Sequence, residues 1–190
     1  MLLILLGLIP FGLFVFWWLI PTLSGLPWRP TSNHRIRKAL EIAQVKPGET
    51  VFDLGSGDGR VVVMAAADFS ARAVGIEISP FHCLVSLIIA WAEGVSENIR
   101  IYLGNFYKVD ISSADVVFAY MTSAQVSRLR PILEKQLKNG ARVVTISFDM
   151  GTWEPQVVNR EELIFLYRMP PKPGSYETYL ANQVTKPEEA

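Results

Sequence analysis

The stretch VFDLGSGDGR, residues 51–60, decides the fold of this chain. Its first residues are apolar up to Leu54, interrupted only by Asp53, as in a short buried strand. Glycines follow, and they let the backbone approach a ligand closely. Residues 60–68 then continue as a helical pattern. A strand, a glycine-rich loop and a helix in this order predict the ligand-binding turn of an α/β fold.

Strands and helices alternate on both sides of that loop. An amphipathic helix is expected at 33–44, capped by Ser32 or Asn33. Ser79-Pro80 is a cap followed by a proline at the first helical position, which predicts a helix to about Glu93. Further expected elements are strands at 50–54, 72–78, 99–103, 115–120 and 141–148, a helix from Pro131 to Asn139-Gly140, and a terminal hairpin of 161–169 with 175–180. The pattern predicts a mostly parallel sheet covered on both faces, with an antiparallel addition at one edge.

The first 28 residues carry no charged side chain, and residues 2–20 are almost all apolar. Twenty helical residues span about 30 Å, the thickness of the hydrocarbon core of a bilayer. The alternative is a cleaved signal peptide, which needs a basic start and small residues at the cleavage site, and neither is present. The segment therefore predicts a retained transmembrane anchor at residues 1–28, with a domain at 29–182 and a polar tail at 183–190.

Basic residues follow this segment directly, at Arg29, Arg35, Arg37 and Lys38, and none precedes it. By the positive-inside rule we expect a single-pass membrane protein whose domain lies on the cytoplasmic side. The formal net charge of zero gives no reason to expect nucleic acid as a partner. A single cysteine excludes an internal disulfide framework.

Carboxylates stand at the ends of the first two strands, Asp53 and Glu77, roughly twenty residues apart, and Asp58 lies inside the loop. Two cofactor classes compete for this plan. A dinucleotide places its pyrophosphate on the helix N-terminus, where a carboxylate would repel it. S-adenosylmethionine has no phosphate and brings two cations, which the carboxylates favour by roughly 1–4 kcal/mol at about 4 Å. The charge pattern therefore indicates S-adenosylmethionine.

Residues 51–60 and 75–80 (GIEISP) resemble the first two motifs of class I methyltransferases. Together with the apolar N-terminus, residues 104–110 (GNFYKVD) and 133–137 (LEKQL), they are similar to the membrane-anchored protein-lysine methyltransferases. That family modifies the ATP synthase c subunit and the ADP/ATP carrier, and it has archaeal relatives. The resemblance implies a Rossmann-like seven-stranded class I methyltransferase sheet with an antiparallel C-terminal hairpin. It departs at residues 118–122, where animal members carry a proline-bearing loop.

The resemblance also implies roles for particular residues. The methionine end of the cofactor would lie on the glycine-rich loop, the ribose on Glu77, and the adenine edge on Asn105 and Phe106. Tyr120 is the candidate for the residue that faces the methyl group, and Trp153 for a wall of the substrate channel. The complete set of candidate cofactor-binding residues is Asp53, Gly55, Ser56, Gly57, Asp58, Glu77, Ile78, Asn105 and Phe106.

Other chemistry-bearing residues fit structural roles. His34 and His82 lack metal-ligand spacing and are expected at surface or cap positions, so no metal site is predicted. Cys83 lies in an apolar helical run and is expected to be buried. Residues 81–92 are apolar on more than one face. Deep burial is the first explanation for this helix, and contact with a membrane or another subunit is the second.

Three functions remain open. The first is methylation of an accessible lysine on a membrane or membrane-proximal protein, with no nucleic-acid partner. The second is methylation of a lipid head group or quinone. The third is a non-catalytic membrane module that binds S-adenosylmethionine. The chain lacks the Asn-Pro-Pro-Tyr type of sequence that marks amino-methylation of adenine or glutamine.

Overall fold

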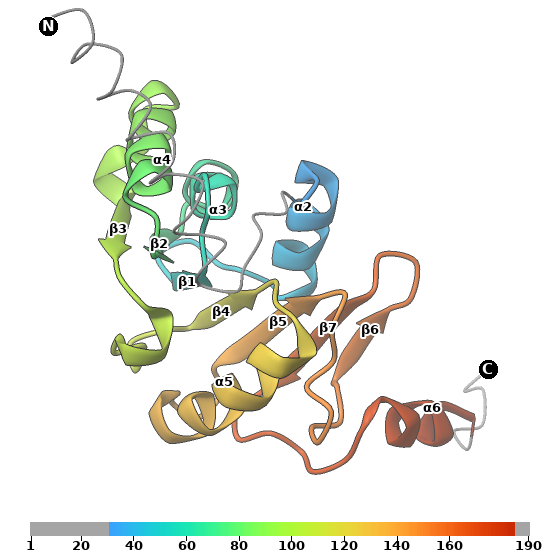
Figure 1. Ribbon diagram of the computed structural model, residues 1–190. Helices are drawn as coiled ribbons and strands as arrows, with labels where there is room; N and C mark the ends of the chain where they lie inside the picture. The colour runs from blue at the N-terminus through green and yellow to red at the C-terminus, as the bar shows by residue number, and fades with distance from the viewer. Residues whose placement is uncertain (1–30, 185–190) are drawn as a thin grey trace, which may run out of the picture.

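A computed structural model describes residues 31–184. Its centre is a seven-stranded sheet in the order β3-β2-β1-β4-β5-β7-β6 (Figure 1). Five strands run parallel, and the last two are antiparallel. The strands are β1 (Thr50–Leu54), β2 (Arg72–Glu77), β3 (Ile99–Leu103), β4 (Val116–Ala119), β5 (Arg142–Ile146), β6 (Val157–Asn159) and β7 (Ile164–Arg168).

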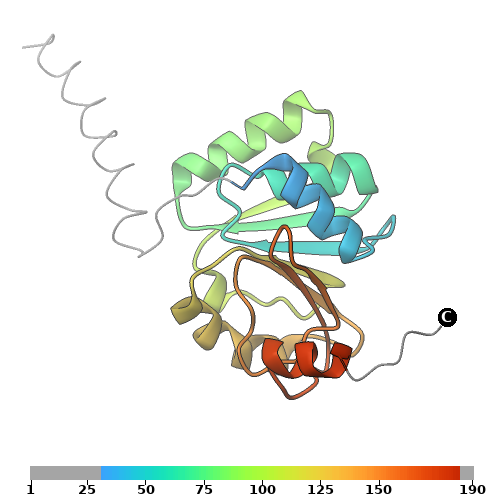
Figure 2. The ribbon, with the colours of Figure 1, turned by 90° about the vertical axis from the view of Figure 1, so that its right-hand side faces the viewer.

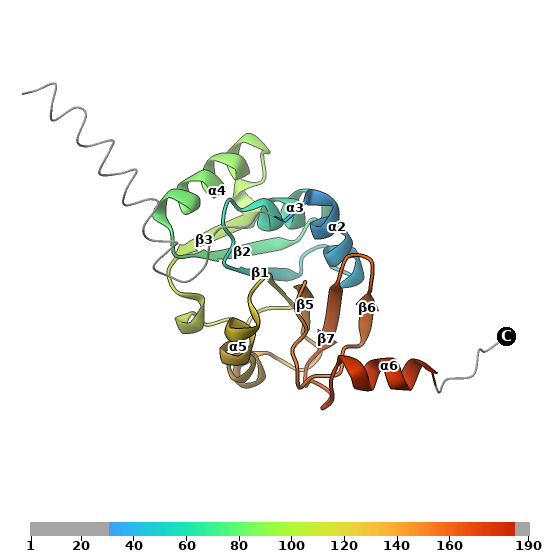
Figure 3. The ribbon, with the colours of Figure 1, turned by 45° about the vertical axis from the view of Figure 1, so that its right-hand side comes forward.

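Helices cover both faces of this sheet (Figure 3). On one face lie α2 (Asn33–Ile42), α3 (Arg60–Phe69) and α4 (Pro80–Ala92), over one half of the hydrophobic core. On the other face α5 (Ser123–Gln136) packs over the second half. Figure 2 shows α6 (Tyr176–Val184) following the hairpin at the C-terminal end of the described chain. Two short 3₁₀ turns, η1 (Ser96–Asn98) and η2 (Phe106–Lys108), flank β3.

The predicted architecture of the domain is confirmed. β1 and β3 have the expected bounds, and the other parallel strands and the helices α2, α3 and α4 differ from the expected ranges by a few residues. Ser32 caps α2 by accepting from Arg35 N at 3.4 Å, and Ser79 caps α4 by accepting from His82 N at 3.4 Å. The mostly parallel sheet with an antiparallel hairpin follows because the central strands β1, β2, β4 and β5 are buried and each parallel crossover carries its own helix or turn.

Two expected elements are wrong. The helix expected from Pro131 begins eight residues earlier, at Ser123, and Pro131 lies inside it. A capping box starts it: Thr122 N donates to Gln125 Oε1 at 2.9 Å. The ring of Pro131 is exposed, so the helix tolerates it on the solvent side.

The second error concerns the C-terminal hairpin. Its two strands are β6 and β7, so only the first expected range, 161–169, contributes a strand. Residues 176–184 form α6, where Tyr176 packs edge-on against Phe165 of β7 at 5.5 Å between ring centroids. The aromatic residues that suggested a strand instead bind a helix onto the sheet face.

The predicted anchor at residues 1–28 and most of the tail lie outside the described residues. Within residues 31–184, every helix is too short or too polar to cross a bilayer.

Candidate functional site

A cavity of about 700 Å³ opens at the carboxyl ends of the parallel strands. This is where an open α/β sheet binds its ligands, because the loops that leave the strands diverge there. All ten candidate residues from the sequence line this cavity: Asp53, Gly55, Ser56, Gly57, Asp58, Glu77, Ile78, Asn105, Phe106 and Tyr120. The volume lies in the range of small-molecule and cofactor sites, roughly 300–1,000 Å³.

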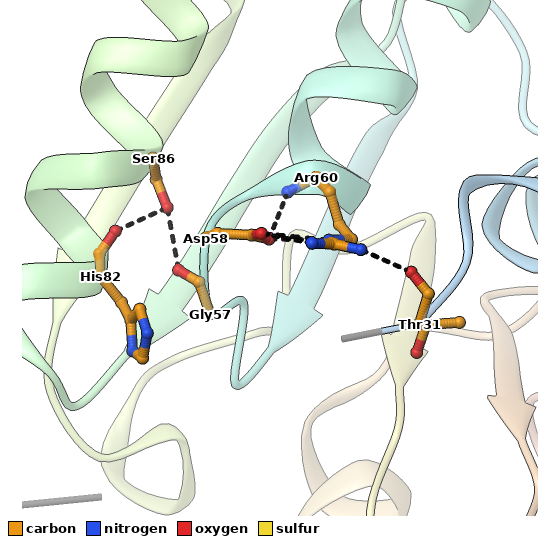
Figure 4. Close-up of polar contacts among 6 residues, drawn as sticks. All are labelled: Thr31, Gly57, Asp58, Arg60, His82 and Ser86. Carbon is orange, nitrogen blue, oxygen red and sulfur yellow. Dashed lines mark hydrogen bonds and ion pairs between the residues drawn. The ribbon is translucent and has the colours of Figure 1, made fainter. Parts of the chain in front are cut away.

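The glycine-rich loop between β1 and α3 packs closely against α4. Gly59 has φ +82°, and a Cβ there would lie 2.7 Å from the Ser86 side chain. Ser86 Oγ donates to the Gly57 carbonyl at 3.0 Å (Figure 4). Glycine at position 59 is therefore required both by the left-handed backbone and by the approach of α4. The contact fixes the loop over the cavity.

The other side of the loop is held by an ion pair. Arg60 Nε and Nη2 donate to the two oxygens of Asp58, at 2.9 and 2.6 Å, and Nη1 donates to the Thr31 carbonyl at 2.8 Å (Figure 4). Burial opposes the ionised form of Asp58, but the hydrogen bonds from Arg60 outweigh it and lower the pKa of Asp58. The charge of Asp58 is thus balanced within the loop, and Asp58 adds less attraction for a cationic ligand than the sequence suggested.

Glu77, at the end of β2, organises the loop from the opposite strand. Its Oε2 accepts from Gly57 N at 2.9 Å, and its Oε1 accepts from Ser79 N at 2.8 Å. An ionised carboxylate has about four acceptor positions, so further hydrogen bonds toward the cavity remain available. The buried carboxylate of Glu77, at the end of β2, therefore joins the loop after β1 to the N-terminus of α4.

Asp53 carries the strongest electrostatic signal in the site. Its side chain is 4% exposed, and burial, with the nearby charges of Glu77 and Asp58, raises its pKa to about 8. Within residues 31–184, Arg60 forms an ion pair with Asp58, and no hydrogen bond or ion pair joins a cation to Asp53. A buried carboxylate without a cation is costly, so its place in the cavity favours a positively charged ligand.

The residues present fit S-adenosylmethionine. Asp53 suits its ammonium or sulfonium group, and Glu77 has acceptor positions for ribose hydroxyls. Ser56 Oγ is buried against Gly75 of β2 and has no hydrogen-bond partner among the described residues. A dinucleotide fits poorly, because its pyrophosphate would repel the ionised form of Asp53 and would gain no attraction from it.

Aromatic side chains and the arginine Arg128 line the part of the cavity beside β3, β4 and α5. Phe106 is buried at the start of η2, and Asn105 caps that turn by accepting from Tyr107 N at 3.0 Å. Arg128 from α5 lies over the Tyr107 ring at 4.6 Å. Tyr120 stands at the end of β4 on the same cavity. These surfaces suit a flat base at one end and an apolar channel at the other.

Sequence reasoning missed several lining residues. His82, expected at a surface or cap position, is in the first turn of α4 but is 8% exposed and lines the cavity. Thr31 and Phe148 also line it. None of these three residues belongs to a cofactor-binding motif. They reach the cavity because the tertiary fold brings the start of the domain, α4 and the segment after β5 together there.

Other assignments are confirmed or corrected. Trp153 is not among the cavity residues: it is 2% exposed, and its Nε1 donates to Glu134 Oε1 at 2.8 Å, so it belongs to the core beneath α5. Cys83 is buried as expected, and burial raises the pKa of its thiol to about 11. His34 is on the surface, 3.3 Å from Glu162. No cluster of metal-binding side chains occurs in the part of the chain that the structure describes.

Comparison with known proteins agrees with this geometry. The family model of the ANTKMT methyltransferase domain matches residues 53–157, more than half of the chain. A protein-lysine N-methyltransferase of Saccharolobus islandicus is 39% identical over 149 residues, which cover 75% of this chain and 92% of that relative. The human lysine N-methyltransferase of the ATP synthase c subunit is 33% identical, with 72% of this chain and 58% of that relative covered.

Two further relatives extend the comparison. The mouse adenine nucleotide translocase lysine N-methyltransferase is 30% identical over 139 residues, and the match spans 60% of its length. The two mammalian relatives are therefore matched over less than two thirds of their length. The crystal structure of an RNA methyltransferase from Salinibacter ruber with S-adenosylhomocysteine has a TM-score of 0.72 and 38% identity, and covers 75% of this chain and 94% of that one.

The chain belongs to the ANTKMT methyltransferase domain family and is an S-adenosylmethionine-dependent methyltransferase.

Proposed function

We propose that this enzyme methylates the side-chain amine of a lysine on a membrane or membrane-proximal protein. The observation that carries the proposal is the buried carboxylate of Asp53, which lies in the cavity without a neighbouring cation. The chain also belongs to a family whose relatives compared above are named as protein-lysine methyltransferases. The relatives also include enzymes named for the ATP synthase c subunit and the adenine nucleotide translocase. Both names refer to proteins of membranes.

The chain's own residues support such a reaction by binding and orientation. When bound, the cofactor supplies an electrophilic methyl group on a positively charged sulfur. In our proposal the loop residues Gly55–Gly57 and the carboxylate of Asp53 hold the methionine end, and Glu77 with Ile78 holds the ribose. Asn105 and Phe106 hold the base. Holding the reacting atoms collinear supplies most of the catalysis.

The incoming amine must lose a proton before it attacks. The free pKa of a lysine amine is near 10.4. The apolar walls of the cavity and a neighbouring cation both lower that pKa by disfavouring the ammonium form. The proton then leaves to solvent, the nitrogen lone pair forms the new N–C bond, and the C–S bond breaks. Tyr120 is our candidate to orient the amine, and no dedicated base is required.

Replacing Tyr120 with phenylalanine should lower kcat about tenfold and leave the cofactor Kd nearly unchanged. The change removes a hydroxyl that can hydrogen-bond the amine, a contribution of about 0.5–1.5 kcal/mol. Steady-state methylation and calorimetry on the same preparations measure both quantities. Tyr102→Phe is the matched control, because Tyr102 is exposed on β3 and does not line the cavity. Equal kcat values for all three proteins would exclude Tyr120 from the reaction.

The membrane part of the proposal rests on the sequence. Residues 1–28 are uncharged and apolar, and they precede the basic residues that start the domain. We propose that they anchor the domain, residues 29–182, on the cytoplasmic side of a membrane, with residues 183–190 as a polar tail. An anchored enzyme meets substrates held in or near the same membrane at a high local concentration.

RNA methylation is the second candidate, because the Salinibacter ruber structure, a close structural match, is described as an RNA methyltransferase. The balance of charge disfavours it. The chain has 18 basic and 18 acidic side chains, whereas phosphate binding rests on an excess of lysine and arginine. Lysine methylation is therefore the function that the observations support best.

One labelling experiment separates the candidates. Membranes and total RNA are incubated with the purified full-length enzyme and S-adenosylmethionine labelled on the methyl group. We expect label in a protein band, and mass spectrometry of that band should place it on lysine. Label in the organic extract would indicate a lipid or quinone substrate, and label in RNA the second candidate. Asp53→Asn serves as the control for enzyme-dependent labelling. No label anywhere, from an enzyme that binds the cofactor, would indicate a non-catalytic module.

A further inference from the structure

Helix α4 presents an apolar surface to its surroundings. All of its exposed side chains are apolar, and none of its residues is charged. Within residues 31–184 ten large hydrophobic side chains are exposed, and five of them belong to this helix. The exposed residues of α4 are Pro80, Phe81, Leu84, Leu87, Ile88, Trp91 and Ala92. The deep burial expected for this helix from the sequence is therefore wrong.

The buried side of α4 is made of smaller or more polar residues. His82, Cys83, Ser86 and Ala90 face the domain. Ser86 has to be small and polar there, because Gly59 approaches it and the Gly57 carbonyl accepts from its hydroxyl. A surface helix of a soluble domain normally turns its large apolar residues inward and its charges outward. In α4 the large residues point outward, which indicates that the medium outside is apolar.

The chain enters the domain close to this helix. Arg60 binds both the Thr31 carbonyl and Asp58, and the residue before Asp58, Gly57, accepts a hydrogen bond from Ser86 of α4 (Figure 4). Only Arg29 and Pro30 separate Thr31 from the uncharged residues 1–28. The three steps from Thr31 to residue 28 span at most about 11 Å. Whatever residues 1–28 are embedded in therefore lies near the loop that α4 supports.

We propose that the outer face of α4, defined by Phe81, Leu84, Leu87, Ile88 and Trp91, lies in the interfacial layer of the same bilayer that holds residues 1–28. The inference rests on the anchoring stated under the proposed function. Trp91, at 77% exposed, suits the membrane–water interface, where tryptophan is enriched. Apolar side chains of a helix that lies in the membrane plane bury themselves to a depth of about 5–10 Å.

A second copy of the chain fits this surface less well. A 13-residue helix is about 20 Å long and about 10 Å wide. Its outer face offers five large exposed side chains, against roughly 20–30 residues a side in a stable protein interface. A bilayer needs no matching surface, so a narrow apolar stripe is sufficient.

Contact through α4 would orient the active site. Ile78 precedes the helix and His82 lies in its first turn, and both line the cavity. With α4 on the bilayer, the cavity lies beside the membrane surface and not far above it. This position favours lysines that protrude only a short distance from a membrane protein.

A fluorescent label on α4 tests the contact in the full-length chain. Ile88→Cys, at a position 55% exposed, is labelled with the environment-sensitive fluorophore NBD, and Val157→Cys on β6, 39% exposed, is the matched control. Native Cys83 stays unlabelled near pH 7, because burial raises its thiol pKa to about 11. The unmodified parent chain measures any background. The proteins are reconstituted into vesicles of phosphatidylcholine and phosphatidylglycerol, with or without brominated acyl chains.

We expect the label at 88 to lose most of its emission in brominated vesicles, while the label at 157 keeps it. A water-like spectrum at 88 would overturn the proposal. So would a blue-shifted spectrum without quenching, which would mean that a second copy or residues 1–28 cover α4. Vesicle flotation is measured on the same samples, and lysine methylation is measured with the same proteins on the membranes of the labelling experiment. A chain that floats with vesicles but methylates no lysine contradicts the proposed function, whereas a chain that floats with label 88 in water contradicts only the α4 contact.

Discussion

Replacing Asp53 with asparagine is expected to weaken binding of S-adenosylmethionine about 10- to 100-fold at pH 8, where the wild-type carboxylate is substantially ionised. The loss corresponds to a hydrogen bond or ion pair with a charged group, about 1.5–3 kcal/mol. The substitution keeps the shape of the side chain and removes its charge. Isothermal calorimetry with wild type and mutant measures the effect. A dinucleotide site would respond in the opposite direction, since removing a negative charge near a pyrophosphate strengthens binding.

The same residue makes binding depend on pH. The pKa of Asp53 is raised to about 8 in the ligand-free fold, and a cationic ligand binds the ionised form. Protons therefore compete with the cofactor below pH 8, and wild-type affinity should rise by up to tenfold per unit between pH 6 and 7.5. Asp53→Asn should flatten this slope. A slope that survives in the mutant would assign the titration to another group.

Stability should change in the opposite direction from affinity. A carboxyl whose pKa is raised on folding binds more protons in the native state, so it lowers stability as pH rises from about 4 to 8. Ligand-free Asp53→Asn lacks this penalty and should melt at a higher temperature than wild type at pH 8. Asp110→Asn is the control, because Asp110 is exposed and lies outside the cavity. A lower melting temperature for Asp53→Asn would show that the carboxylate is not under electrostatic strain.

Glu77→Ala should have a larger effect, because it damages both the fold and the site. It leaves the buried amides of Gly57 and Ser79 without their acceptor. Each unsatisfied buried group costs about 1–3 kcal/mol, so for the two amides we expect a loss of roughly 2–6 kcal/mol in the free energy of unfolding. Cofactor binding should fall below detection, since the loop and the ribose acceptor are lost together. Denaturant unfolding and calorimetry measure the two effects.

Glu77→Gln separates the two roles. The amide oxygen can accept from one of the two backbone amides, and the amide nitrogen faces the other as a second donor. We therefore expect stability between wild type and Glu77→Ala, with cofactor affinity still strongly reduced. Glu97→Ala, at an exposed position of η1, is the control for removing a carboxylate elsewhere. Wild-type stability in Glu77→Ala would mean that the two amides find other acceptors.

The sequence by itself determined the fold class and located the candidate residues that line the cavity. β1 and β3 are short apolar runs bounded by turn residues, so local pattern located them correctly. The ten candidate residues lie at the ends of β1, β2, β3 and β4 or in the loops that follow them. Because parallel strands end at one edge of the sheet, knowing the strand ends was enough to bring those residues into one cavity.

Tertiary structure decided what depends on contacts between distant segments. His82 lies on the cavity and Trp153 does not, since α4 and the loop after β5 take their places only when the layers pack. Residues 176–184 form a helix because Tyr176 packs against Phe165, which overrides the local pattern for a strand.

The apolar run of α4 shows the limit most clearly. Its composition indicates an apolar environment on more than one face but cannot tell a protein core from a bilayer, because both exclude water. The packing of the layers determines which side of α4 faces the domain. The close approach of Gly59 requires the small face of α4, with Ser86, to turn inward. Leu84, Ile88 and Trp91, on the opposite side of the helix, are consequently left on the surface.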